Sequence, residues 1–183
     1  MTVGIIAEDE SDVAVIRKLT CRMAATKRIG FKHFVGNGCG KLRRKCSAWA
    51  RSLVERSCSC IVVVHDLDAF TEADLRRELA TAVAGAHPRI SAVVIPKREI
   101  EAWFLFDPNA IKEVFGGRED AKITGNPENL SDPKKYLEEL VWKKYRKRYL
   151  HTIHNEKLAD KISLSKLENA HSFGAHKAFV DRF

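Results

Sequence analysis

The sequence predicts an α/β fold with a mainly parallel four-stranded sheet, helices on both faces and a helical C-terminal portion. Three observations lead to this prediction. Short apolar, β-branched runs alternate with amphipathic helical patterns through the first half of the chain. The runs are apolar at nearly every position, which is typical of strands buried on both faces. The second half contains helical patterns but no further runs of this kind. Strands that alternate with helices pair in parallel through right-handed crossovers.

The expected strands share a β-branched, apolar core and lie at residues 2–7, 31–35, 60–65 and 90–96. The helices expected between them lie at residues 12–28, 42–56 and 71–84. The first helix carries Val13, Ile16, Leu19 and Met23 on one stripe. Ser11 is the expected N-cap of this helix, and Gly30 lies just past its end. The first half therefore repeats strand, helix, strand, helix.

From Glu99 onward the pattern changes. A short helix with Trp103 and Phe104 leads into a segment rich in Gly, Asn and Pro at residues 116–133, which predicts a loop. Helices are expected after it at residues 134–150 and 156–167, with a short one within residues 172–183. We expect residues 1–106 to form the α/β core and residues 107–183 to form a helical C-terminal extension packed on it.

Composition limits the class of protein. A chain of 183 residues with 45% hydrophobic content suits one domain with a sizeable core. Its formal charge of +8 favours polyanionic partners, although charge alone says nothing about chemistry. The cysteine count of five is odd, no charged leader-like start is visible and no apolar run reaches membrane-spanning length. We expect a reduced, cytoplasmic protein without a membrane partner.

Acidic residues follow three of the expected strands. The first strand ends in AEDESD, the third in HDLD and the fourth in PKREIE, which places Glu8, Asp66, Asp68, Glu99 and Glu101 at one edge of the sheet. Crowded carboxylates repel and raise one another's pKa unless a cation or water screens them. Carboxylate oxygens suit Mg²⁺ or Mn²⁺. The sequence therefore predicts a divalent metal site at this edge.

Helix capping or plain solvation explains any single acid of this kind equally well. We expect Asp9, Glu10 and Asp74 to have such roles. Capping does not explain why acids end three strands of one sheet, or why Asp66 and Asp68 bracket a turn.

In their order along the chain, these acids resemble the TOPRIM domain of topoisomerases, primases and OLD-type nucleases. The family places a glutamate after its first strand and Asp-x-Asp after its third, as Glu8 in GIIAEDESD and Asp66 and Asp68 in VVVHDLD do here. Ser11 and Asp12 resemble the Thr/Ser-Asp pair that often follows the glutamate. The chain departs from the family at one point, since the aspartate after Glu8 stands where the family usually has glycine.

Later segments extend the resemblance to small stand-alone TOPRIM-like proteins of prokaryotes. PKREIEAWFLFD is similar to a Glu-x-Glu-Ala-Trp run in those proteins, and NPENLSDPKKYL and a later SF pair are similar to theirs. The resemblance implies a TOPRIM/Rossmann-like core over most of the chain. It also implies an association with a partner ATPase, as in prokaryotic defence systems.

The resemblance implies that Asp66 and Asp68 bind the metal, while Glu8 is a ligand or general acid/base in phosphodiester cleavage. A metal at this place would neutralise charge in the transition state and activate water. Glu101 is expected to complete the catalytic site rather than Glu99, because two residues two apart on a helix face different ways. No motif positions a tyrosine nucleophile, so a nuclease acting on DNA or RNA is the economical interpretation.

Cations near the predicted edge are candidates for substrate binding. Lys97 and Arg98 lie beside the acids that follow the fourth strand, and they are equally well explained as solvated charges. The glycine loop GNGCGKLRRK brings Lys41 and Arg43 to the start of a helix, but its spacing does not match a phosphate-binding P-loop. We expect contacts with the substrate backbone there at most.

The cations of the segment KKYLEELVWKKYRKRYLH are expected to attract nucleic acid. Its aromatic residues would suit base stacking, but a buried apolar stripe explains them better.

Two alternatives remain open at this stage. The acidic start resembles the Mg²⁺ pocket of signalling receiver domains, although the lysine-proline pair that receivers place after their fifth strand is missing. The other alternative is a catalytically silent subunit that regulates a partner ATPase. The sequence leaves the oligomeric state undetermined.

Overall fold

The computed structural model describes residues 1–24, 28–67 and 70–183. Its sheet is four-stranded and entirely parallel, with the strand order β2-β1-β3-β4. The strands are β1 (Thr2–Ala7), β2 (Gly30–Val35), β3 (Cys60–Val64) and β4 (Ile90–Val94). The predicted α/β fold class is confirmed, and β1 and β3 occupy the centre of the sheet.

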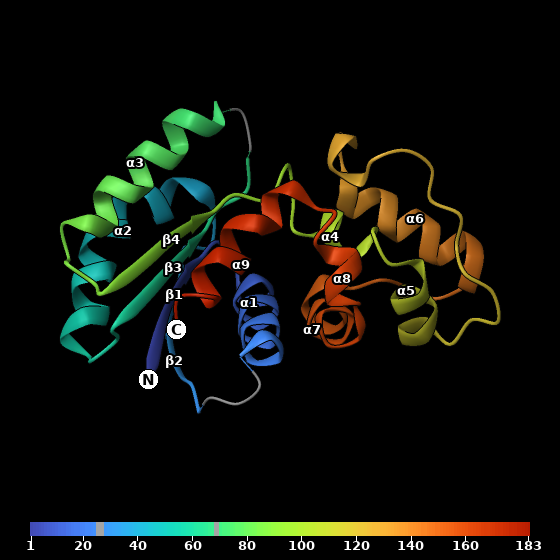
Figure 1. Ribbon diagram of the computed structural model, residues 1–183. Helices are drawn as coiled ribbons and strands as arrows, with labels where there is room; N and C mark the ends of the chain where they lie inside the picture. The colour runs from blue at the N-terminus through green and yellow to red at the C-terminus, as the bar shows by residue number, and fades with distance from the viewer. Residues whose placement is uncertain (25–27, 68–69) are drawn as a thin grey trace.

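Helices cover both faces of the sheet (Figure 1). Helix α1 (Glu10–Met23) and the final helix α9 (Gly174–Val180) cover one face, while α2 (Cys39–Glu55) and α3 (Glu72–Ala84) cover the other. Successive side chains of β3 point to opposite faces, so Val62 and Val64 join the core under α1 while Ile61 and Val63 join the core under α2 and α3. This two-sided burial explains why the strand is apolar throughout.

The start of α1 differs from the prediction. Asp9, not Ser11, is the N-cap, and its Oδ1 accepts hydrogen bonds from the backbone N–H groups of Ser11 at 2.7 Å and Asp12 at 3.1 Å. Asp12 in turn accepts from the Asp9 N–H at 3.4 Å, which completes a capping box. The helix therefore begins at Glu10, and the expected capping role of Asp9 is confirmed. It ends at Met23, earlier than the predicted residue 28.

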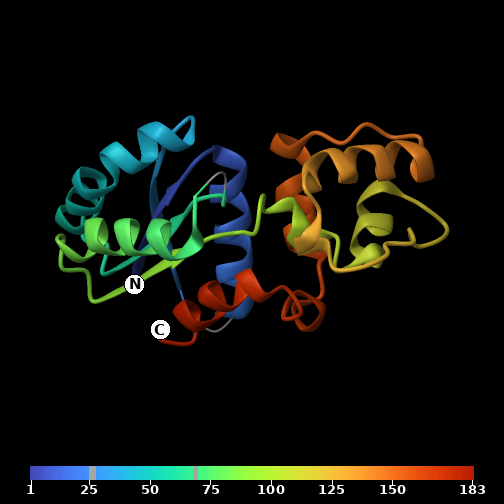
Figure 2. The ribbon, with the colours of Figure 1, turned by 90° about the horizontal axis from the view of Figure 1, so that it is seen from above.

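The remaining helices form the helical C-terminal part, which lies beside the sheet in Figure 2. They are α4 (Glu101–Phe104), α5 (Pro108–Phe115), α6 (Pro133–Tyr145), α7 (His151–Lys161) and α8 (Leu164–Leu167), with short 3-10 turns η1 (Pro127–Asn129) and η2 (His171–Phe173). Helix α7 packs against α1, and the chain then returns so that α9 lies against β4.

Other predicted helix boundaries were also wrong. The helix expected at residues 134–150 ends at Tyr145 because Arg146 adopts a left-handed conformation with φ of 54°. The next helix consequently begins at His151 rather than residue 156. Helix α2 begins at Cys39 rather than residue 42, directly after Gly38, whose φ of 120° turns the chain into the helix. Residues 116–133 form the expected loop apart from η1.

The segments that follow β4 meet around Trp103, which is fully buried. Its indole Nε1 donates to Ser172 Oγ at 2.8 Å, and its ring meets Phe173 edge-on with centroids 5.3 Å apart. The Glu128 carboxylate accepts from the backbone N–H groups of His171 and Ser172, each at 3.0 Å. The EAW, PEN and SF segments of the sequence therefore pack as one unit.

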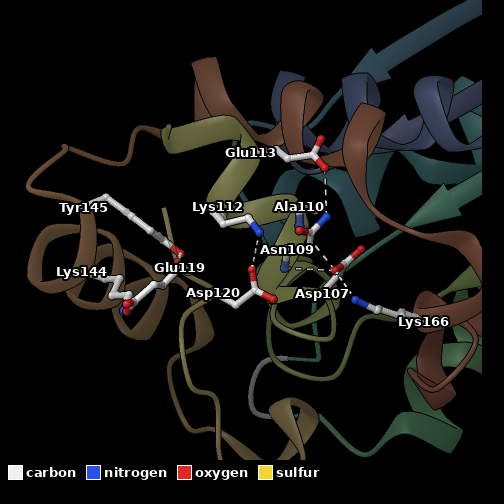
Figure 3. A network of polar contacts seen from close by, with 10 residues as sticks. All are labelled: Asp107, Asn109, Ala110, Lys112, Glu113, Glu119, Asp120, Lys144, Tyr145 and Lys166. Atoms are coloured by element: carbon white, nitrogen blue, oxygen red, sulfur yellow. Dashed lines mark hydrogen bonds and ion pairs between the residues drawn. The ribbon is translucent and has the colours of Figure 1, made fainter. Parts of the chain in front are cut away.

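A buried aspartate ties the helical part together (Figure 3). Asp107, 2% exposed, caps α5 through its Oδ1, which accepts from the N–H groups of Asn109 and Ala110. The same oxygen lies 2.8 Å from Lys166 Nζ, and Oδ2 accepts from the Ser163 N–H at 2.8 Å. Burial acts to raise the pKa of Asp107, but these donors outweigh it and hold the pKa below its ordinary value.

Within the described ranges, no helix combines the length and the apolar character that crossing a bilayer requires. The cysteines whose side chains are described are free thiols, with Cys21 exposed and Cys46, Cys58 and Cys60 buried.

Replacing Asp107 by alanine should lower the free energy of unfolding by about 2–4 kcal/mol, because Ser163 and Lys166 would lose a buried partner. The folded-state pKa lies below the unfolded value of about 3.9, so this contribution is full above that pH and is lost as the pH falls through the folded-state pKa. Urea titration of both proteins measures the difference. Asp120→Ala is the matched control, since its ion pair with Lys112 is half-exposed. Equal losses in the two variants would contradict the assignment.

Candidate functional site

The acids that follow the strands gather at the carboxyl edge of the sheet. Glu8 comes directly after β1, Asp66 follows β3, and Glu99 and Glu101 follow β4. Backbone hydrogen bonds hold these segments side by side: the Leu67 N–H donates to the Pro96 carbonyl at 3.1 Å. The parallel strand order thus brings together segments that are far apart in the sequence.

Glu8 is fixed against the segment that begins at Asp66. Its Oε1 accepts from the Asp66 N–H at 3.0 Å and lies 3.1 Å from Nδ1 of His65. The same His65 nitrogen lies 2.7 Å from the Asp66 carbonyl oxygen. Both neighbours of Nδ1 are acceptors, so this nitrogen carries the proton and donates it. His65 is completely buried, and its Nε2 has no hydrogen-bond partner in the part of the chain that the structure describes.

Asp66 lies within a concentrated negative field. Burial raises its pKa well above the ordinary value, and the charges of Asp12, Glu8, Glu101 and Glu99 raise it further. Among the residues with described positions, no cation forms an ion pair with the Asp66 carboxylate. This combination favours a proton or an external cation at Asp66.

Asp12 is a member of the cluster to which sequence analysis assigns no role. It lies in the first turn of α1, is 7% exposed, and has a pKa raised by burial and by the charges of Asp9, Glu101 and Glu8. The only signal in the sequence is its place in the Ser-Asp pair after Glu8. In the capping box its Oδ2 accepts from the Asp9 N–H, which holds the carboxylate beside the segment that follows β1.

Glu101 is anchored by the helical part of the chain. Its side chain is buried, and Oε1 accepts from the Tyr149 hydroxyl at 2.9 Å and from Asn155 Nδ2 at 3.2 Å. The Tyr149 hydroxyl also contacts Asn155 Oδ1. Burial and the neighbouring Glu101 charge raise the pKa of Tyr149, so its hydroxyl stays a neutral donor. No sequence pattern pointed to Asn155, whereas a packed role was predicted for the aromatic residues of the segment that contains Tyr149.

Glu99 precedes α4 and is directed to a different partner. Its Oε2 accepts from the Lys134 N–H at 2.9 Å, at the start of α6. Burial raises the pKa of Glu99, although the Lys134 N–H opposes this effect. The expectation that Glu99 and Glu101 point in different directions therefore agrees with their contacts, even though both charges act on Asp66.

The predicted substrate-binding cations lie at the margins. Lys97 is exposed and donates to Asn129 Oδ1 at 3.3 Å, while Arg98 is exposed in a left-handed conformation with φ of 75°. Both therefore lie at the surface on the turn that joins β4 to the Glu99 segment.

On the other side of the sheet, Lys41 is exposed in the first turn of α2. Arg43 donates from Nε and Nη2 to Glu78 at 2.9 and 2.5 Å, and its guanidinium lies 4.2 Å from the centre of the Phe70 ring. Arg43 thus joins α2 to α3, and its contact with substrate stays a prediction.

The donors at this edge fit a hard divalent cation in type and charge, because they are carboxylates that raise one another's pKa. Within residues 1–24, 28–67 and 70–183, no three His, Cys, Asp or Glu side chains are grouped closely enough to hold a metal ion. Asp68, the other predicted ligand, lies outside the described residues. The described acids alone therefore do not form a metal site.

A parallel α/β sheet with buried acids at its carboxyl edge defines the structural class of this protein. The chain belongs to the family described as domain of unknown function DUF4276, whose model matches residues 7–180. That match begins at the last residue of β1 and covers the other three strands, the acidic cluster and the helical part. No curated protein and no solved structure matched the chain.

Asp66→Asn should stabilise the protein at neutral pH without divalent cations, because it removes one of the repelling charges. The folded-state pKa of Asp66 lies above its unfolded value, so the stability linked to its proton is full below about pH 3.9 and lost as the pH rises through the folded-state pKa. The Tm of Asp66→Asn should exceed that of the wild type by a difference that grows over the same pH range, to roughly 2–4 °C.

Thermal melts in EDTA across this pH range measure the effect, with the exposed Asp74→Asn as the control. Adding Mg²⁺ or Mn²⁺ should raise the Tm of the wild type and leave that of Asp66→Asn nearly unchanged. A variant that melts at or below the wild-type temperature at every pH would show that the carboxylates do not repel as described.

Proposed function

We propose that this protein is a metal-dependent nuclease that cleaves phosphodiester bonds with a TOPRIM-like acidic site, using Mg²⁺ or Mn²⁺. The observation that carries the proposal is the environment of Asp66. Burial and the carboxylates that follow β1 and β4 raise its pKa, and the described residues provide it with no compensating cation. The order of Glu8 and the Asp-Leu-Asp motif along the chain supports the same assignment.

In this proposal Asp66 and Asp68 hold the metal, with Glu8 beside them. A bound divalent cation would neutralise charge on the phosphate and lower the pKa of attacking water. Glu8 has a fixed position because the Asp66 N–H and His65 both hold its Oε1. It therefore acts as a further ligand or as the group that moves a proton between water and the leaving oxygen.

Glu101 supports the site from the segment that follows β4. Its hydrogen bonds with Tyr149 and Asn155 keep a buried carboxylate in place without a paired cation. We assign it to the catalytic acids because its charge acts on both Asp12 and Asp66. Lys97, Arg98 and Lys41 are exposed and supply positive charge that would contact substrate phosphates.

The trigger for cleavage is a separate part of the proposal. The resemblance to stand-alone TOPRIM-like proteins supports a partner ATPase and a role as a defence effector in the prokaryotic cytoplasm. Cleavage by the purified chain alone would contradict a strict requirement for the partner. Stable phosphorylation of Asp66 by a small phosphodonor, without nuclease activity, would favour the receiver alternative.

Asp66→Asn and Glu8→Gln should each reduce cleavage by at least about 100-fold, because each removes a charged group that acts in the transition state. The measurement is the rate of cleavage of labelled DNA and RNA, single- and double-stranded, with Mg²⁺ or Mn²⁺ and with EDTA. Glu10→Gln is the matched control, because Glu10 lies two residues after Glu8 and pairs with His33 at the surface.

Equal rates for wild type, Asp66→Asn and Glu8→Gln would identify a contaminating nuclease and end the proposal. Cleavage that persists in EDTA would exclude a metal-dependent mechanism.

A further inference from the structure

The turn between α6 and α7 presents three consecutive cations to solvent. Arg146, Lys147 and Arg148 are all exposed, and none of their side chains has a hydrogen-bond or ionic partner among the described residues. The left-handed conformation of Arg146 ends α6 here and turns the chain toward α7. We call this segment, residues 146–148, the basic turn.

The preceding cations differ from the basic turn. Lys143 pairs with Glu139 at 3.1 Å, and Lys144 pairs with Glu119 at 2.9 Å. Their charges are balanced within the molecule. The unbalanced positive charge of this region is therefore concentrated at the basic turn.

An exposed tryptophan lies beside the basic turn. The Trp142 side chain is 57% exposed, and its carbonyl accepts from the Arg146 N–H at 3.1 Å. The other tryptophans are engaged: Trp103 is fully buried, and Trp49 stacks on Phe34 with centroids 5.3 Å apart. An exposed indole presents an apolar face on which another flat ring can stack.

Trp142 and the basic turn line one pocket of about 260 Å³. The lining residues are Glu138, Trp142, Lys147, Arg148, Tyr149 and Leu150. The volume is below the roughly 300–1,000 Å³ of sites for drug-sized ligands, so it suits one flat ring system. The pocket therefore offers an aromatic surface with two cations beside it and one acid, Glu138.

We propose that this pocket binds one nucleotide of a single-stranded nucleic acid, with its base against Trp142 and its phosphate against Lys147 and Arg148. A single-stranded base has a free face that can stack on an aromatic ring, whereas the bases inside a duplex already stack on one another. This inference rests on the proposed function for its substrate class, and it adds the strandedness and the place of contact.

One residue, Tyr149, contacts both the pocket and the acidic cluster. Tyr149 lines the pocket, and its hydroxyl donates to Glu101 at 2.9 Å. A strand bound at Trp142 would therefore lie close to the carboxyl edge of the sheet. An acidic peptide would match the cations but would leave the face of Trp142 uncovered, so nucleic acid fits the whole pocket better.

The test is fluorescence anisotropy with a labelled single-stranded oligonucleotide and with the blunt duplex of the same length, in EDTA so that neither is cleaved. Trp142→Ala should weaken single-strand binding by about tenfold and leave duplex binding unchanged, because only the free base stacks. Trp142→Phe should restore most of the affinity. Lys147→Ala with Arg148→Ala should weaken binding to both. The log–log slope of the salt dependence should fall by about 0.7 per cation for the single strand and by about 0.9 for the duplex.

Arg77→Ala is the control for charge, because Arg77 lies on α3 in an exposed pair with Asp74. Thermal melts should show that each variant folds. Wild-type protein that does not bind the single strand, or Trp142→Ala that binds it normally, would overturn this inference. Asp66→Asn separates the two proposals, because it should bind the oligonucleotide normally while losing cleavage. If it cleaves normally, the proposed function fails and the binding site stands.

Discussion

Repulsion among carboxylates at the carboxyl edge of the sheet is the constraint on which this structure depends. Because β1 and β3 are neighbours and β4 follows β3, the acids after these strands cannot avoid one another. Among the residues that the structure describes, hydrogen-bond donors hold these acids in place. Glu8 accepts hydrogen bonds from the Asp66 N–H and from His65. Glu101 accepts hydrogen bonds from Tyr149 and Asn155. A hydrogen bond from a backbone N–H, a hydroxyl or an amide holds an acid in place without cancelling its charge.

The helical C-terminal part completes this arrangement. It supplies the hydroxyl and amide that hold Glu101 and the backbone N–H that holds Glu99. Helix α7 packs against α1, which carries Asp12, and α9 covers the sheet beside α1. The predicted division at residue 106 therefore runs between these acids and the residues that hold them. Residues on both sides of that division build the candidate site.

The strands could be predicted because burial on both faces leaves a direct mark, a short run that is apolar throughout. Helix ends were harder to predict. Asp9 and Ser11 are both good N-caps, and only the hydrogen bond that the Asp9 N–H donates to the Asp12 carboxylate distinguishes them. Arg146 gives no sign of a left-handed helix end, because arginine has no special tolerance for that conformation.

The proximity of Glu8 and Asp66 follows from a general rule for parallel sheets, so it was predictable. The partners of Glu101 were not, because Tyr149 and Asn155 lie 48 and 54 residues further along the chain. Their contact depends on the packing of α7, which no short sequence pattern encodes. Trp142 illustrates the same difficulty, since the sequence groups it with aromatic residues that are mostly packed and only the fold leaves it exposed.

Crystals soaked with Mn²⁺ and measured for anomalous scattering would test the central claim most directly. We expect an anomalous peak from an Mn²⁺ ion that is coordinated by the Asp66 carboxylate and by at least one more acid that follows β1 or β3. A fully occupied Mn²⁺ site elsewhere, with no peak at Asp66, would contradict it.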